Sequence, residues 1–167
     1  MIVGLTGYKR SGKSTAAYAL SHKLGFEIYA LADPIRRLCK DVFLWDDHWI
    51  DNRKEEVDPR WGLSYRTAAQ LIGTELFRKA LPELNGGQPR SIWIQRMERV
   101  YLQRKLSMFM AGQDYRMVVS DVRFPDEADM VRELGGVILR IDRATENGDT
   151  HESETSVDLI RPDAVIA

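Results

Sequence analysis

Short apolar runs recur along the chain and are separated by polar turns. The first covers residues 2–6 and ends at a glycine, and similar runs cover 26–31, 116–120 and 137–141. Runs of this length between turn residues are typical of buried strands. A fifth run begins near Asp163. The pattern therefore predicts five short strands.

Stretches with helical spacing lie between these runs. Residues 14–24 form one, and Gly25 ends it. Asp33 and Pro34 suit a helix start, with Asp33 as the capping residue. The other predicted helices are Ser64 to about Leu81 with Ala68, Leu71, Ile72 and Leu76 facing inward, Ser91 to about Met110, and 125–134.

Strands that alternate with helices indicate an α/β fold. The expected architecture has three layers, with a mostly parallel five-stranded sheet, helices on both faces, and a helical or irregular insert. We expect one domain over residues 1–167. Segments 44–63 and 82–90 are candidate lids, because the first holds three tryptophans without a clean period and the second is rich in Pro, Asn and Gly.

Composition and charge narrow the class of protein. Hydrophobic residues make up 44% and charged residues 29% of the 167 residues, and the net charge is -1. This balance is typical of a globular protein and provides no general basic field for nucleic acid. The single cysteine, Cys39, lies in an apolar stretch and is interpreted as a small buried residue. No apolar run reaches the length of a membrane span, and no signal peptide is recognisable, so we expect a cytoplasmic protein.

The segment 7–14, Gly-Tyr-Lys-Arg-Ser-Gly-Lys-Ser, follows the first strand. It matches the phosphate-binding pattern G-x-x-x-x-G-K-[ST], in which backbone N–H groups surround phosphate oxygens. Lys13 would reach the β- and γ-phosphates of ATP, and Ser14 would offer its hydroxyl to Mg²⁺. The motif predicts the three-layer fold of P-loop NTPases and a nucleotide site.

Asp121 follows the third predicted strand directly. A carboxylate at this position would hold the hydration shell of Mg²⁺. Many strands also end in Asp to cap a helix, and that alternative stays open.

The class of P-loop protein can be narrowed further. The guanine-reading Asn-Lys-x-Asp motif of GTPases is absent from the sequence. Arginines recur near the expected carboxyl ends of the strands instead: Arg36, Arg37, Arg66, Arg123 and Arg143. Transfer between two phosphates needs cations at such places, although any one arginine is also consistent with a surface position.

The sequence resembles the deoxynucleoside monophosphate kinases of phages and related viruses over nearly its whole length. The resemblance rests on residues 7–15, 30–37, 58–64, 66–75 and 120–128, with His-Glu-Ser-Glu at 151–154 in addition. It implies transfer of the ATP γ-phosphate, with Mg²⁺, to a deoxynucleoside monophosphate. A homodimer and the cytoplasm of a host cell follow from the same resemblance.

The resemblance also implies roles for individual residues. The loop motif, not the resemblance, assigns Arg10, Ser11, Gly12, Lys13, Ser14 and Thr15 to ATP, and Arg143 joins them from its place after the fourth strand, where a surface role is the alternative. Those expected to face the acceptor are Lys9, Asp33, Arg36, Arg37, Arg66 and Arg123, with Gln70, Glu75, Trp93 and Glu127 around its base and sugar. Lys13, Arg123, Asp33 and Arg37 would act on the transferred group. Gln70 and Glu75 are also consistent with a helix surface, Trp93 with the core, and Asp33 with a cap alone.

Two other functions stay open at this point. A P-loop kinase could phosphorylate a hydroxyl, such as that of dephospho-coenzyme A or of a modified base in DNA, with Asp33 as the base. A nucleotide-binding module without turnover is the third hypothesis, against which the presence of Lys13, Ser14 and Asp121 counts. Related kinases continue past the last strand into a turn and helix that hold adenine, so here Arg143 is the only candidate for that contact.

Overall fold

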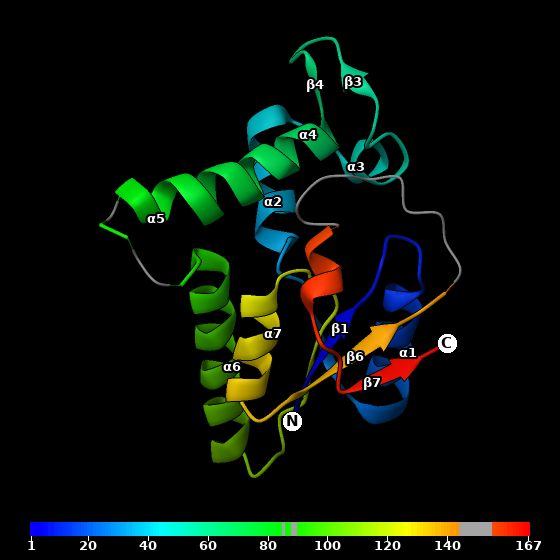
Figure 1. The fold of residues 1–167 in the computed structure, drawn as a ribbon, viewed down its shortest axis with the longest axis vertical. Helices are drawn as coiled ribbons and strands as arrows, with labels where there is room; N and C mark the ends of the chain where they lie inside the picture. The colour runs from blue at the N-terminus through cyan, green and yellow to red at the C-terminus, as the bar shows by residue number, and fades with distance from the viewer. Residues whose placement is uncertain (85, 88–89, 144–154) are drawn as a thin grey trace. The chain divides into compact units, whose positions relative to one another are not determined.

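The computed structural model describes residues 1–84, 86–87, 90–143 and 155–167 (Figure 1). The chain forms two compact units. Unit 1 comprises Met1–Leu31 and Ile94–Ala167, and unit 2 comprises Ala32–Trp93. Each unit has a core of its own.

Unit 1 is built on a five-stranded sheet. Its strands are β1 (Ile2–Thr6), β2 (Glu27–Tyr29), β5 (Met117–Val119), β6 (Val137–Ile141) and β7 (Ala164–Ile166). The strand order is β2-β5-β1-β6-β7, and all neighbours are parallel. The predicted sheet of five strands is thus confirmed, with β1 at its centre.

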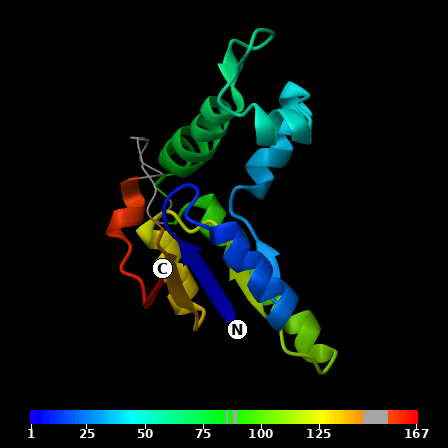
Figure 2. The same ribbon diagram turned by 90° about the vertical axis from the view of Figure 1, so that its right-hand side faces the viewer.

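The order of the strands fixes the faces on which the helices lie. From β1 to β2 the chain crosses the sheet in one direction, and every later connection crosses in the other. Because such connections are right-handed, α1 (Lys13–Leu24) covers one face, and α6 (Ile92–Met110), α7 (Pro125–Glu133) and η2 (Ser156–Leu159) lie on the opposite face. Figure 2 shows α1 and α7 on opposite sides of β1. This is the predicted three-layer P-loop NTPase fold.

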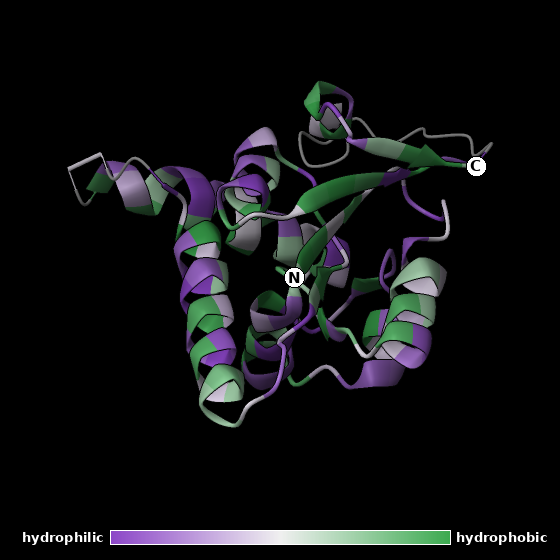
Figure 3. Ribbon diagram, turned by 90° about the horizontal axis from the view of Figure 1, so that it is seen from below, coloured by the Kyte–Doolittle hydropathy of each residue, from purple (hydrophilic) through white to green (hydrophobic). Residues whose placement is uncertain are grey.

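The core of unit 1 forms where the strands meet α1. Val3 and Leu5 of β1 pack with Ala17, Phe26, Val118 and Ile141. Every residue of β1 and β5 is buried, as the continuous apolar runs predict for central parallel strands. Figure 3 shows the strands as predominantly hydrophobic and the helices as striped.

Unit 2 is mainly helical. It contains α2 (Asp33–Phe43), α3 (Asp47–Asn52), the antiparallel strands β3 (Val57–Asp58) and β4 (Leu63–Ser64), α4 (Tyr65–Gln70), a π-helix η1 (Leu71–Ala80) and α5 (Leu81–Leu84). Its core surrounds Cys39, Trp45, Ile50 and Ala68. Cys39 is fully buried, consistent with its interpretation as a small core residue.

The insert expected to be helical or irregular has regular structure over much of residues 44–63. Helix α3 and the β3–β4 hairpin lie there, and Trp45 is 2% exposed, with its indole stacked on Phe43 at 4.6 Å between ring centroids. The indole N–H of Trp45 donates to Asp58 at 2.7 Å. Whether this segment acts as a lid stays a prediction.

The helix that begins after Ser64 also differs from its prediction. Ser64 caps it as expected, accepting a hydrogen bond from the Thr67 N–H. Leu71 and Leu76, however, are 51% and 47% exposed, whereas Gly73 and Thr74 are buried. The wider turn of the π-helix η1 shifts the inward positions away from a spacing of 3.6 residues. Pro82 does not end the helix, since α5 continues to Leu84, and the candidate lid 82–90 extends into residues outside the described part.

Within the described residues, no helix has both the length and the apolar character that crossing a membrane requires.

Candidate active site

The loop between β1 and α1 has the backbone of a phosphate-binding loop. Gly7 and Gly12 have φ angles of 135° and 103°, and Arg10 between them has a φ of 65°. A side chain at Gly7 would place its Cβ 2.4 Å from the carbonyl oxygen of Ile141. Glycine is therefore required at position 7 by both conformation and space.

Lys13 begins α1 and folds back over this loop. Its Nζ donates to the carbonyl oxygens of Gly7 at 2.7 Å and of Tyr8 at 2.6 Å. Ser14 lies in the first turn of α1 and is exposed. The positive end of the helix dipole and the ammonium group thus meet at one end of the sheet, which suits an anion such as a polyphosphate.

Ser11 lies inside the loop, where its side-chain hydroxyl is buried and has no hydrogen-bond partner among the described residues. Arg10 and Thr15 are exposed, and Lys9 is half-buried. These are the positions expected to contact nucleotide phosphates, and they lie on a single continuous segment.

Tyr8, Arg140 and Asp158 form a cluster of contacts that tether the loop to β6 and η2, and the sequence did not reveal it. The Tyr8 hydroxyl donates to Asp158 of η2, and Arg140 of β6 pairs with the same carboxylate at 3.3 Å. The Arg140 guanidinium lies over the Tyr8 ring, 5.2 Å from its centroid. The hydrogen bond to Asp158 is the main cause of the raised pKa of Tyr8. No sequence signal links residues 150 positions apart.

Asp121 follows β5, the strand beside β1. Its Oδ1 accepts a hydrogen bond of 2.7 Å from the Leu31 N–H, and the next residue, Val122, donates its N–H to the Leu5 carbonyl at 3.1 Å. The carboxylate therefore lies at the carboxyl edge of the sheet, one strand from the phosphate-binding loop. The oxygen atoms of Asp121 and Ser14 are of the type that Mg²⁺ prefers, so these residues fit the expected metal.

The described residues contain no group of three or more His, Cys, Asp or Glu side chains that could form a metal site of the protein alone. A magnesium ion here would depend on nucleotide phosphates and water for its other ligands.

Arg123 and Glu127 form a turn that leads into α7. The Glu127 carboxylate is 4% exposed and accepts hydrogen bonds from the N–H groups of Arg123 at 2.8 Å and Phe124 at 3.1 Å. It thereby caps the helix to which it belongs. This capping role was not foreseen, since the sequence lacks a Ser or Thr at the capping position.

In unit 2, Asp33 is the first residue of α2, and Ala32 occupies the capping position without a side-chain bond. The predicted cap by Asp33 is therefore wrong, because the helix begins at Asp33 itself. Asp33 and Arg37 are both exposed, and Arg37 makes no ion pair within the described part of the chain.

Two further predicted arginines of unit 2 are in ion pairs. Arg36 contacts Asp51 at 2.7 Å and Asp47 at 2.6 Å, and Arg66 contacts Glu55 at 2.6 Å. The Asp51 and Asp47 carboxylates raise the pKa of Arg36, with the hydrogen bond to Asp51 as the largest contribution. All three partners come from one segment, α3 and the turn after it, and the sequence analysis missed them.

The remaining candidates of unit 2 differ in exposure. Gln70 ends α4 half-buried, and Glu75 is exposed and pairs with Lys79 at 3.2 Å, one helical turn away. Trp93 is 9% exposed, packs against Phe77 and donates its indole N–H to the Gly73 carbonyl at 2.9 Å. Its contacts are those of a core residue.

The structure gathers the candidates into two sets. Unit 1 carries the phosphate-binding loop with Asp121, Arg123, Glu127 and Arg143, which is exposed after β6. Unit 2 carries Asp33, Arg36, Arg37, Arg66, Gln70, Glu75 and Trp93. The residues expected to hold ATP all belong to unit 1, and most of those expected to face the acceptor belong to unit 2.

Known proteins provide an independent comparison. A protein of Acanthamoeba polyphaga mimivirus, provisionally named deoxynucleotide monophosphate kinase, is 37% identical over 166 residues, covering 96% of this chain and 84% of the relative. Among solved structures, shikimate kinase from Aquifex aeolicus vf5 is 14% identical, with a TM-score of 0.47, over 99% of this chain and 86% of that one. No protein-family model matches the chain.

Proposed function

We propose that this chain, which belongs to the deoxynucleotide monophosphate kinase family, transfers the γ-phosphate of ATP to a deoxynucleoside 5′-monophosphate. The products are ADP and the deoxynucleoside diphosphate. One bond forms between the γ-phosphorus and an acceptor phosphate oxygen, and the bond to the oxygen that bridges the β- and γ-phosphates breaks.

The observation that carries this proposal is the loop from Gly7 to Ser14. Two glycines with positive φ allow its N–H groups to converge, and Lys13 lies across it with hydrogen bonds to two of its carbonyl oxygens. On ATP binding, Lys13 would exchange those carbonyls for the β- and γ-phosphate oxygens. The contact of the ammonium group with phosphate is stronger than its contact with a carbonyl oxygen, because both partners are then charged.

Mg²⁺, when bound, would neutralise charge on the β- and γ-phosphates. Ser14 and Asp121 are the residues that would hold it, Asp121 partly through water. Asp121 is oriented for this task by the Leu31 N–H, which occupies Oδ1. Arg123 would offset the charge that develops on the transferred group, and Arg143 is the candidate for a contact with adenine.

The acceptor would be held mainly by cations. Lys9, Arg37 and Arg123 would contact its phosphate, with Arg36 and Arg66 in support, and Asp33, Gln70 and Glu75 would contact the sugar and base. A monophosphate already presents an anionic oxygen near neutral pH, since its second pKa is about 6. The reaction therefore requires orientation and charge neutralisation and no general base.

Initial rates test this proposal. Purified protein with ATP and Mg²⁺ would be assayed for ADP release against each common deoxy- and ribonucleoside monophosphate. We expect transfer to at least one deoxynucleoside monophosphate, with its diphosphate as the product. Transfer to none of them would contradict the proposal.

A kinase for a hydroxyl acceptor is the second candidate, and the exposed position of Asp33 favours it. The carboxylate makes no capping bond in α2, so the helix does not need it. A hydroxyl acceptor would need such a base to take its proton. The same assay, extended to dephospho-coenzyme A and to DNA that contains a hydroxymethylated base, separates the two functions.

A further inference from the structure

Three carboxylates of one short segment hold two of the arginines expected at the acceptor. Asp47 and Asp51 lie one turn apart on α3, and Glu55 follows in the turn after the helix. Asp47 and Asp51 contact Arg36 of α2, and Glu55 contacts Arg66 in the first turn of α4. All of these residues belong to unit 2, so the pairing is internal to one compact body.

The contacts have the geometry with which arginine binds a phosphate. Asp51 accepts from both terminal nitrogens of Arg36, at 2.7 and 2.8 Å, and Asp47 adds a bond of 2.6 Å. Glu55 places both oxygens within 2.7 Å of the Arg66 Nε. The two parallel bonds between Arg36 and Asp51 are of the kind that guanidinium groups form with phosphate oxygens, and the Arg66 Nε shares its single N–H between the two Glu55 oxygens.

The charge of the two aspartates also matches that of an acceptor phosphate. Hydrogen bonds from Arg36 lower the pKa of Asp51, and hydrogen bonds from Arg36 and then Lys40 lower that of Asp47 to about 2. Both carboxylates are therefore ionised at neutral pH and together contribute two negative charges. A nucleoside monophosphate carries between about 1.5 and 2 negative charges under the same conditions.

We propose that Asp47, Asp51 and Glu55 occupy Arg36 and Arg66 in place of the acceptor phosphate and set the acceptor affinity by competing with it. This inference rests on the proposed function, and it assigns these carboxylates a role in the strength and selectivity of acceptor binding. A ligand with a dianionic phosphate can displace them, whereas a neutral nucleoside cannot. Arg37, which lies beside Arg36, would contact the phosphate without an exchange.

The direction in which the acceptor KM changes distinguishes two roles for the carboxylates: competition with the acceptor phosphate, or positioning of Arg36 for binding it. If the carboxylates compete, Asp51→Asn and Asp47→Asn lower the acceptor KM by about two- to fivefold each, the factor that an exposed ion pair is worth. If they hold Arg36 in a productive position, the same variants raise the acceptor KM. Glu55→Gln should change the KM in the same direction as the other two.

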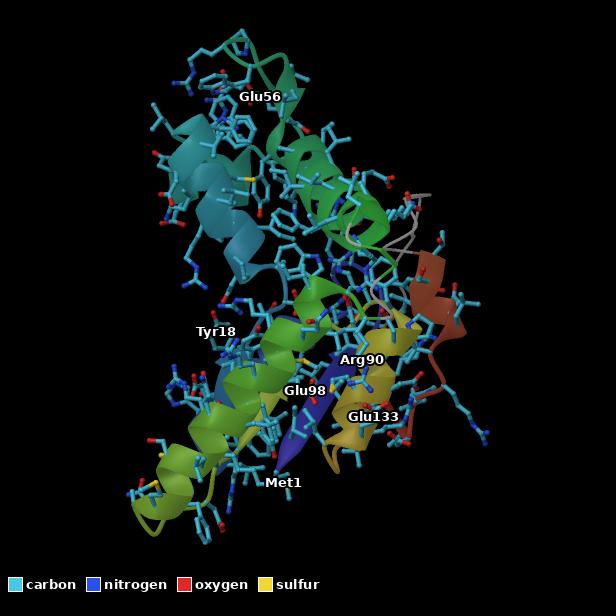
Figure 4. All side chains as sticks on the ribbon, turned by 90° about the vertical axis from the view of Figure 1, so that its left-hand side faces the viewer. Met1, Tyr18, Glu56, Arg90, Glu98 and Glu133 are labelled. Carbon is cyan, nitrogen blue, oxygen red and sulfur yellow. The ribbon has the colours of Figure 1, made fainter. Side chains whose placement is uncertain are left out.

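Glu56→Gln is the matched control. Glu56 (labelled in Figure 4) lies in the same segment, directly before β3, and pairs with Arg53, which is not among the residues expected to face the acceptor. Its substitution removes the same charge from the chain. An equal fall in KM for this control would assign the effect to overall charge and overturn the proposal.

A binding measurement distinguishes failure of this inference from failure of the proposed function. Inorganic phosphate would be titrated into the wild type and Asp51→Asn, with the Nε–Hε signal of Arg36 followed by NMR. Tighter binding in the variant supports the exchange even if no mononucleotide is a substrate. If deoxynucleoside monophosphates are substrates and Asp51→Asn alters neither phosphate affinity nor KM, the function stands and the exchange is refuted.

Discussion

The Glu127 carboxylate holds the backbone of Arg123, accepting its N–H at 2.8 Å. Glu127 is buried, whereas Arg123 is half-buried in the turn that Glu127 fixes. The conformation of a predicted catalytic arginine thus depends on a residue that caps the following helix.

Glu127→Ala should therefore impair both the fold and the reaction. Loss of a helix cap costs about 1 kcal/mol of the free energy of unfolding, and buried N–H groups left without acceptors add to this. We expect a lower melting temperature and a lower kcat. Glu127→Gln retains an acceptor oxygen and should retain most of both. The control is Glu133→Ala, an exposed position of the same helix (Figure 4), which should change neither. A normal kcat in Glu127→Ala would show that the action of Arg123 does not depend on the hydrogen bond to Glu127.

Trp93 and Trp61 provide a test of how burial affects the contribution of an indole hydrogen bond to stability. Its indole N–H donates to the Gly73 carbonyl in a buried position, whereas Trp61 donates to the Phe43 carbonyl while 41% exposed. Trp93→Phe should lower the free energy of unfolding by about 1 kcal/mol or more, and Trp61→Phe by less, because water replaces the lost bond only at the exposed site. Denaturant unfolding measures both. Equal losses in the free energy of unfolding would show that burial does not decide how much these two hydrogen bonds contribute.

The buried thiol of Cys39 predicts a dependence of stability on pH. Burial raises the pKa of Cys39 from 9.0 to about 11. The unfolded chain therefore ionises first, and stability that is complete below pH 9 falls as the pH rises toward 11. The slope due to this thiol is at most about 1.4 kcal/mol per pH unit.

The comparison of wild type with Cys39→Ala isolates this term from the other groups that titrate at high pH. Urea unfolding at several pH values between 8 and about 11 should give a steeper loss for the wild type. Cys39 should also react slowly with a thiol reagent at pH 8 in the folded protein. Parallel pH profiles for the two proteins would contradict the assignment.

Asp33→Asn distinguishes the two acceptor classes. With a monophosphate acceptor the substitution should weaken acceptor binding more than it slows the chemical step. With a hydroxyl acceptor it should reduce kcat by about a hundredfold or more, because the base is lost. Separate measurement of kcat and the acceptor KM decides the matter. An unchanged KM together with an unchanged kcat would remove Asp33 from the site.

Lys13→Ala should abolish phosphoryl transfer and leave the fold intact. The ammonium group donates to the carbonyl oxygens of Gly7 and Tyr8 in its own loop, and its loss removes the cation expected at the β- and γ-phosphates. Lys23→Ala, at an exposed position of the same helix, is the control and should retain activity. Turnover at the wild-type rate in Lys13→Ala would exclude Lys13 from the mechanism.

Local features of this protein could be predicted from the sequence. The five strands of the sheet and the helices between them follow from apolar runs and were predicted correctly. The loop from Gly7 to Ser14 is contiguous, so its place after β1 could also be predicted, whereas its binding of phosphate stays a prediction. Features that depend on distant or unusual contacts could not. The Tyr8–Asp158 bond joins residues 150 positions apart, the π-helix around Gly73 changes a spacing assumed to be 3.6, and the Asp33 side chain lies one residue inside the helix that it was expected to cap.

The central claim is that the loop from Gly7 to Ser14 binds the phosphates of ATP. A crystal structure with a non-hydrolysable ATP analogue and Mg²⁺ tests it most directly. The account predicts the triphosphate within the loop, Lys13 withdrawn from the Gly7 and Tyr8 carbonyls onto the β- and γ-phosphates, and Ser14 on the metal. A triphosphate bound elsewhere, with Lys13 still on those carbonyls, would contradict it.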